Sequence, residues 1–394
     1  MYRGLFMADI HIGSMSYKDT FDAISYIKDM LKAYTKDGPL DFIIIGGDYF
    51  DKQLYANDPF IKLAQKLMIY IIISARVIRI VNGTSSHDCN QYGLFDTLEE
   101  DIPLLSKIPY DFKVITTVSE EELLPGLHVL YVPEEYVFDK EEYYKDYLSE
   151  DKHYDYIFGH GVIKEAFPYI KHSKTVEKNR RRAPEFEAGE LFDRVRGHVI
   201  FGHYHIHSEY YDDKVSYSGS LFRWKQGEEE DKGFYYLEAS PEEENYYKLF
   251  VVNDTANKYI TKYYGYNDKI FDPGADLELE AKRVIKLKKN KNIYQLRLVF
   301  NIPLAYENPE GFINFWRERF KSDEFRKSIR VEYGNGYTDT KEKRKEELSA
   351  DLTEDEKIIL DKNIPEVDKI AYFLKRFKGI DMSISKIEKY LKTE

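Results

Sequence analysis

The stretch FIIIGGDYFD, at residues 42–51, runs from four apolar residues through two glycines to two aspartates. A short apolar run followed by histidine or aspartate recurs along the first 205 residues. The other four segments are Asp9-Ile10-His11, Ser86-His87-Asp88, Gly159-His160-Gly161 and Gly202-His203-Tyr204-His205. Continuous apolar runs are typical of strands buried on both faces, and ligand-binding side chains of open α/β sheets collect at the carboxyl ends of the strands. The five segments therefore predict one rim of a sheet that holds two divalent metal ions.

The first part of the chain, residues 1–238, alternates these apolar runs with helical patterns. Apolar side chains recur at helical spacing in residues 17–34 and in residues 59–73. Strands are expected at residues 42–45 and 77–81. This β-α-β-α order predicts an α/β domain.

The pattern changes after residue 238, and no further segment of this kind follows. Residues 239–338 are expected to form a smaller α+β unit, with strands at 293–302 and 328–333 and a helix at 309–320. Residues 339–350 carry charges of both signs and are expected to form a linker.

Residues 351–394 are expected to form a helical tail. Thr353 and Glu356 have the spacing of a capping box that starts one helix, and Pro365 can open a second helix at its first turn. These short helices either pack against the main body or dock on a partner protein. The linker before them favours a partner.

The composition is that of a soluble protein with more than one domain. The chain has 394 residues, of which 43% are hydrophobic and 32% charged. Cys89 is the single cysteine, which excludes an internal disulfide and fits a reducing cytosol. The most apolar run, residues 67–74, is too short to span a bilayer, so we expect a cytoplasmic protein without a membrane partner.

The formal net charge of -12 disfavours a nucleic-acid partner, because binding to phosphates needs lysine and arginine. Basic residues nevertheless cluster between the fourth and fifth segments. The candidates for contact with a phosphate backbone are Lys174, Lys178, Arg180, Arg181 and Arg182, with Arg223 after the last histidines. A solvated helix face is the alternative interpretation of the cluster.

Imidazole and carboxylate ligands together suit Mn²⁺, Fe²⁺ or Zn²⁺, and the lack of cysteine ligands argues against a structural zinc site. A carboxylate that bridges two ions about 3.5–4 Å apart can support an in-line phosphoryl displacement. The residues themselves thus predict metal-assisted hydrolysis of a phosphate ester.

The ordered set Asp-x-His, Gly-Asp-x-x-Asp, His-Asp, Gly-His and Gly-His-x-His resembles the signature of the calcineurin-like metallophosphoesterases. Tyr217-Ser-Gly-Ser220 and Asp231-Lys-Gly-Phe234 are similar to segments of the SbcD-type nucleases of double-strand-break repair, including their phage relatives. This resemblance implies a β-sandwich flanked by helices, a small α+β capping domain that binds DNA, and a helical C-terminal tail.

The resemblance also implies a role for each site residue. The first metal would be held by Asp9, His11, Asp48 and His205, with Asp48 as the bridge. The second would be held by Asp48, His160, His203 and one further ligand. His87 would stabilise the transition state or protonate the leaving oxygen, while Asp88 would orient His87 and Asp51 would brace the metal ligands. A loop or helix-capping role is the alternative for the last two. Mn²⁺ is the expected metal, with Mg²⁺ and Fe²⁺ as alternatives.

The third segment departs from the family. The family sequence there is Gly-Asn-His-Asp, whose asparagine ligates the second metal, whereas this chain has Gly83-Thr84-Ser85-Ser86-His87-Asp88. Ser86 then becomes the candidate ligand, bound directly, through water or not at all. A weaker second metal site is expected.

In function, the resemblance implies a two-metal DNA exonuclease and endonuclease, the nuclease subunit of an SbcCD-like complex in DNA repair, recombination or degradation. Its partners would be DNA, an SMC-like ABC ATPase gripped by the tail, and a second copy that pairs through residues 59–73 and 92–105. It would act in the cytoplasm, the host's if a phage encodes it. The alternatives are a phosphatase or phosphodiesterase on the same fold, and a non-catalytic regulator that binds DNA ends and an ATPase.

Overall fold

The computed structural model describes residues 1–95, 98, 109–166, 181–224, 228–254, 256, 258–265, 272, 274–286, 294–303, 306–322, 325, 329–334, 365–378 and 382. Contacts between Cα atoms divide the chain into two compact units. The first comprises residues 1–262, 274–298 and 319–330, and the second comprises residues 263–273, 299–318 and 331–394.

The first sheet of the large unit has six strands in the order β14-β13-β1-β2-β3-β4. Their bounds are Tyr2–Met7 (β1), Leu40–Gly46 (β2), Ala75–Val81 (β3), Asp111–Ile115 (β4), Gly233–Ser240 (β13) and Asn245–Val252 (β14). Strands β1 to β4 run parallel, and β13 and β14 are added antiparallel. The predicted boundary at residue 238 is therefore wrong, because it falls inside β13 and the sheet continues to Val252.

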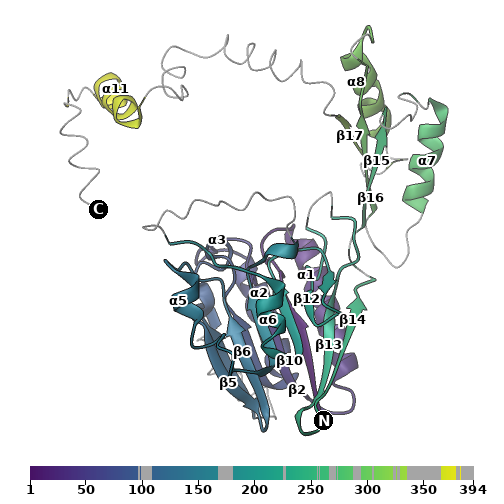
Figure 1. Ribbon diagram of the computed structural model, residues 1–394. Coiled ribbons are helices and arrows are strands. Elements are labelled where there is room, and N and C mark those ends of the chain that lie inside the picture. Colours follow the sequence, from purple (N-terminus) through teal and green to yellow (C-terminus); the bar gives the residue numbers. More distant parts are fainter. Residues whose placement is uncertain are drawn as a thin grey trace. The chain divides into compact units, whose positions relative to one another are not determined.

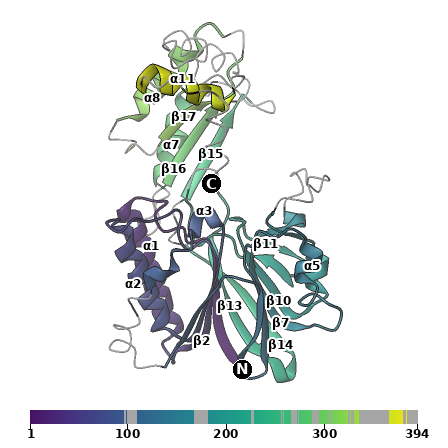
Figure 2. The same cartoon turned by 90° about the vertical axis from the view of Figure 1, so that its left-hand side faces the viewer.

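Helices α1 (Tyr17–Tyr34) and α2 (Phe60–Ile72) connect the first three parallel strands. The Ser16 side chain caps α1 by accepting a hydrogen bond from the backbone N–H of Asp19. Both helices bury their apolar faces against β1 and β2, and Figure 2 shows them along one outer face of the large unit. The two helices expected from the spacing of apolar residues are thus confirmed.

The second sheet also has six strands, in the order β11-β12-β10-β7-β6-β5. Their bounds are Ser119–Leu124 (β5), Leu127–Val132 (β6), Tyr154–His160 (β7), Val195–Gly202 (β10), Ser208–Tyr210 (β11) and Val215–Tyr217 (β12). The outer strands β5 and β11 are antiparallel to their neighbours, and the other pairs are parallel. Every residue of β7 is buried, as expected for a strand covered on both faces.

The two sheets pack face to face. One core cluster draws side chains from both, and the rings of Phe6 (β1) and Phe158 (β7) stack with their centroids 5.5 Å apart. Short helices α5 (Lys140–Tyr144) and α6 (Ala188–Phe192) cover the outer face of the second sheet (Figure 1). The α/β class is confirmed, with two mixed sheets enclosed by helices.

A third sheet has the order β15-β16-β17, with bounds Lys258–Tyr264, Tyr294–Phe300 and Ile329–Tyr333. Helices α7 (Ala275–Lys286) and α8 (Pro309–Phe320) accompany these strands in the chain. Helix α8 begins and ends where the sequence predicted. Helix α11 (Glu366–Lys378) follows Pro365 as expected.

Two other predictions concern segments beyond this description. The linker at residues 339–350 and the helix that starts near Thr353 lie outside the described residues. So do residues 96, 97 and 99–105 of the second segment expected to pair in a dimer, whose beginning lies in the 3-10 helix η1 (Gln91–Phe95). No helix in the described part of the chain is long and apolar enough to cross a membrane.

Candidate metal centre

Two loops at the carboxyl ends of β1 and β2 begin the site. The backbone N–H of Asp9 donates to Gly47 O at 3.1 Å, and that of His11 donates to Asp48 O at 2.9 Å. Asp9, His11 and Asp48 all have positive φ angles, between 47° and 51°, in the left-handed region that residues other than glycine rarely adopt. Such backbone geometry persists where the surrounding structure fixes it, commonly at functional sites.

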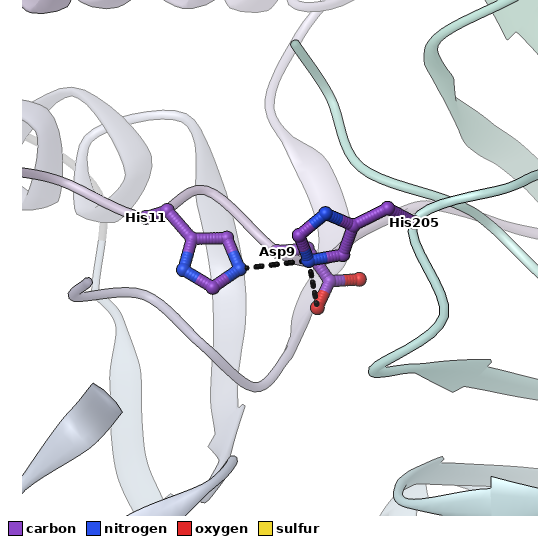
Figure 3. Close-up of side chains that lie close together, drawn as sticks. All are labelled: Asp9, His11 and His205. Carbon is purple, nitrogen blue, oxygen red and sulfur yellow. Dashed lines mark hydrogen bonds and ion pairs between the residues drawn. The ribbon is translucent and has the colours of Figure 1, made fainter. Parts of the chain in front are cut away.

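The first group of ligand atoms comes from Asp9, His11 and His205 (Figure 3). The Nε2 atoms of the two histidines face each other at 3.0 Å, and His205 Nε2 lies 4.0 Å from Asp9 Oδ1. Asp9 and His11 are buried, whereas His205 is partly exposed.

Glu228 fixes the orientation of His205, a contact that the sequence did not predict. His205 Nδ1 donates to Glu228 Oε1 at 3.0 Å, which leaves the Nε2 lone pair directed at His11. Burial acts to lower the pKa of His205, but the hydrogen bond to Glu228 and the negative charges of Asp9 and Glu228 together outweigh it and raise that pKa. A carboxylate behind a histidine is a common arrangement at metal sites, where it sets the tautomer of the ligand.

Asp48 connects the first group to a second. Its Oδ2 lies 3.8 Å from His11 Nε2 and its Oδ1 lies 3.4 Å from His160 Nε2. The second group consists of Asp48, His160 and His203. A carboxylate with one oxygen toward each group has the arrangement needed to bridge two cations.

The tautomer of His160 suits metal binding. Its Nδ1 donates to Gly46 O at 2.8 Å, so that Nε2 faces Asp48. Gly47 makes this approach possible, because it has a φ of 84° and a Cβ atom there would overlap the imidazole of His160. The backbone N–H of His203 donates to both Asp9 oxygens, at 3.0 and 3.2 Å, and so ties the two groups together.

The electrostatics of the second group predict that metal binding releases a proton. Burial opposes the charged form of His160, but the charge and hydrogen bond of Asp48, with the charges of Asp9 and Glu134, together outweigh it and raise the pKa of His160 to about 10. Burial and the nearby His160 lower the pKa of His203 to about 4, so His203 is neutral at pH 7. A cation at this group must displace the His160 proton at any pH below about 10.

We therefore expect the affinity for Mn²⁺ to rise by up to roughly tenfold per pH unit between pH 6.5 and 8.5, with about one proton released per ion at this group. Calorimetric titrations in buffers with different ionisation enthalpies measure the proton count directly. An affinity that stays constant over this range would contradict the assignment of a protonated His160.

Ser86 is not part of the site, and the prediction that it completes the second group is wrong. Ser86 is exposed. The hydroxyl that reaches the site belongs to Thr84, which directly follows Gly83 as the asparagine follows glycine in the family motif. Thr84 Oγ1 lies 3.4 Å from Asp48 Oδ2 and 3.2 Å from Glu134 Oε2. The two additional residues therefore come after the ligand position, not before it.

Glu134 is a site residue that the sequence analysis missed. Its Oε2 lies 3.4 Å from His203 Nδ1 and 3.9 Å from His160 Nε2. The signal was present, because Glu134 follows the apolar run of β6 as the other site residues follow theirs. No histidine or aspartate stands beside this glutamate, so its segment lacks the pattern that marks the other five.

His87 lies beside the first group, on the short helix α3 (Ser85–Asp88). One of its nitrogens comes within 4.8 Å of ligand atoms of His11 and Asp48. Its Nδ1 donates to the backbone carbonyl of Asp51 at 2.7 Å. The Asp51 carboxylate lies 3.5 Å from His11 Nδ1, in position to brace that ligand.

Asp88 does not orient His87, which corrects the role implied by the resemblance. Its buried carboxylate accepts hydrogen bonds from the backbone N–H groups of Gly83, Asp48 and Phe50, at 2.8, 3.2 and 3.2 Å. The Tyr92 hydroxyl donates to it as well. Asp88 thus holds the loops that carry the site.

The predicted DNA contacts are only partly described. Lys174, Lys178 and Arg180 lie outside the described residues, whereas Arg181 and Arg182 are exposed. Arg223 was expected to contact DNA from the protein surface. The residue is instead only 2% exposed, and its guanidinium donates to the carbonyl oxygens of Glu229 and Glu230.

The donor set fits divalent cations. It combines imidazole nitrogens and carboxylate oxygens, the ligands that Mn²⁺, Fe²⁺ and Zn²⁺ accept. Hydrogen bonds at the Nδ1 atoms of His160 and His205 direct both Nε2 atoms into the site. The buried His/Asp groups could thus hold metal.

The chain matches no protein-family model, and no curated protein matches its sequence.

Proposed function

We propose that the chain is a two-metal phosphodiesterase that cuts DNA, an SbcD-type nuclease of the calcineurin-like metallophosphoesterases. The observation that carries the proposal is Asp48, whose two oxygens face separate groups of histidine and carboxylate ligands. Asp9, His11, Asp48 and His205 would hold one ion, and Asp48, His160 and His203 would hold part of the other. When bound, the pair would supply an activated water and neutralise the charge that develops on the phosphate.

His87 is the proposed proton donor to the leaving oxygen. The hydrogen bond from its Nδ1 to the Asp51 carbonyl fixes the ring. In the protonated ring, Nε2 would carry the second proton and pass it to the leaving oxygen, which leaves a neutral imidazole. The side chain is partly exposed, so a substrate can reach it. Attack in line with the departing 3′ oxygen would leave a 5′ phosphate on the product.

The choice of DNA as substrate and of an SMC-like ABC ATPase as partner rests on the SbcD-type resemblance. Arg181 and Arg182 offer exposed positive charge for a phosphate backbone. Helix α11, in the segment proposed to grip the ATPase, has an amphipathic sequence, with Val367, Ile370 and Leu374 at helical spacing. The assembly would contain two copies of the chain and act in the cytoplasm on Mn²⁺, or on Mg²⁺ or Fe²⁺.

The test is cleavage of linear duplex DNA by the purified chain with Mn²⁺ and its ATPase partner. We expect His160→Ala to lower the rate by about 10³-fold or more, because it removes a metal ligand and several kcal/mol of transition-state stabilisation. His87→Ala is expected to lower it by roughly 10²–10⁴-fold, the usual contribution of a general acid.

His128→Ala is the matched control, because His128 is exposed on β6. It is expected to cut DNA like the wild type. The proposal is wrong if the wild type cuts no DNA, or if His160→Ala cuts as well as the wild type. Turnover of small phosphodiesters by a chain with no affinity for DNA would favour a phosphodiesterase of another specificity on this site.

A further inference from the structure

The loop after β6 brings a carboxylate to the second metal group. Strand β6 pairs with β7 up to Val132 and Gly159, the residue before His160. Pro133 ends the strand, and the backbone N–H of the next residue, Glu134, donates to Asn82 O at 3.2 Å. Its position is thus fixed both by the sheet and by the loop that follows β3.

The Glu134 carboxylate faces the Thr84 hydroxyl, as do the ligand atoms of the second metal group. Its Oε2 lies 3.2 Å from Thr84 Oγ1, and that hydroxyl also lies 3.4 Å from an atom of each of Asp48, His160 and His203. Two carboxylates and two imidazoles therefore surround one hydroxyl. A hydroxyl can donate only one hydrogen bond, so Thr84 cannot satisfy both the Asp48 and the Glu134 carboxylates.

Burial makes this excess of acceptors costly. Glu134 is only 6% exposed. Within 4.0 Å, its ion-pair partners among the described residues are His160 and His203, and His160 is nearer to Asp48 than to Glu134. A buried carboxylate needs a counter-charge, which a divalent cation at this point would supply.

The geometry points to Glu134 as the fourth protein ligand of the second metal ion, with Asp48, His160 and His203 as the other three. This inference rests on the proposed two-metal function. Thr84 occupies the position of the family's asparagine, but its hydroxyl faces the two carboxylates and can donate to only one of them. An anionic ligand from another strand thus takes the place of a neutral amide.

The substitution changes the charge of the centre. Asp9, Asp48 and Glu134 together offset three of the four positive charges of two divalent ions, where the amide-containing set would offset two. A second ion bound by two carboxylates is expected to be held firmly, not weakly as the loss of the asparagine alone suggested. A carboxylate in place of an amide adds an anionic oxygen donor to the two imidazoles, which suits Mn²⁺ and Fe²⁺.

Metal binding to the full-length protein tests the inference independently of catalysis. After removal of metal with a chelator, Mn²⁺ is titrated into wild type, Glu134→Gln and Glu135→Gln, with calorimetry and electron paramagnetic resonance as readouts. Glutamine keeps the shape of the side chain and removes its charge. Glu135 is the matched control, because its carboxylate accepts from the Val118 N–H and the Tyr143 hydroxyl instead of facing the site.

We expect two bound ions in the wild type and in Glu135→Gln, with the spectrum of a coupled pair. Glu134→Gln is expected to bind the first ion normally and the second at least about tenfold more weakly, the lower end of the range for losing a group that only supports a metal ligand. Glu134→Asp keeps the charge on a shorter side chain, so its affinity for the second ion is expected to lie between those of the wild type and Glu134→Gln. Thermal unfolding of each metal-free variant verifies that it is folded.

Normal binding of both ions by Glu134→Gln, or a single ion in the wild type, would overturn the inference. Failure of the proposed function gives a different result. A wild type that binds two ions and loses the second in Glu134→Gln, yet cuts no DNA, would support the ligand and contradict the nuclease. A wild type that cuts DNA while Glu134→Gln keeps both ions would support the nuclease and contradict Glu134 as a ligand.

Discussion

Asp48→Asn is expected to abolish the paired binding of metal ions and to lower phosphodiesterase activity by about 10³-fold or more. An amide has one oxygen and no charge, so it cannot present an anionic oxygen to each group as Asp48 does to His11 and His160. It also removes the attraction that raises the pKa of His160. The measurements are the number of Mn²⁺ ions bound by calorimetry and the rate of DNA cleavage.

Asp41→Asn is a suitable control for this change. Asp41 lies near the amino end of the same strand, where it accepts from the Arg3 N–H and pairs with Arg76. It is expected to bind two ions and cut DNA at the wild-type rate. If Asp48→Asn also binds two coupled ions, Asp48 is not the bridge.

The fold could be anticipated from the sequence wherever a buried strand or an amphipathic helix left a periodic signal. Helices α1 and α8 begin and end at the predicted residues, because an apolar stripe defines their length. The extent of the first sheet could not be anticipated. Strand β14 has exposed and half-buried residues in alternation, and only its pairing with β13 places it in the large unit.

The candidate site likewise contains residues that the sequence predicted and residues that it could not. Residues at the carboxyl ends of buried strands, such as Asp9, Asp48 and His160, were expected at one site and belong to the two adjoining ligand groups. The third segment is misleading because Ser86 directly precedes His87, as the asparagine precedes the histidine in the family motif. The turn into α3 instead directs Thr84 into the site. Gly83, which precedes it, has no side chain, and this lets the loop approach Asp48. Hydrogen bonds that bridge distant loops, such as the one from His205 to Glu228, leave no periodic signal.

Asp88→Ala is expected to lower the free energy of unfolding by about 3–5 kcal/mol, which corresponds to a decrease of roughly 10 °C in melting temperature. The change leaves three backbone N–H groups and the Tyr92 hydroxyl without their acceptor, and each unsatisfied buried donor costs about 1–3 kcal/mol. These donors lie in the loops that hold Asp48 and His87, so we also expect weaker binding of both ions. Thermal unfolding in chelator and Mn²⁺ titration measure the two effects.

Asp88→Asn separates this structural role from the orientation of His87. The amide oxygen can take the place of Oδ2 and keep the hydrogen bonds from Gly83, Asp48 and Tyr92, while the amide nitrogen then faces the Phe50 N–H. One lost acceptor predicts a destabilisation of about 1–3 kcal/mol, smaller than that of alanine. A carboxylate that served only to orient His87 would give another pattern, in which both variants fold as stably as the wild type and lose activity alone. The order wild type, asparagine, alanine in melting temperature is the result that the hydrogen bonds around Asp88 require.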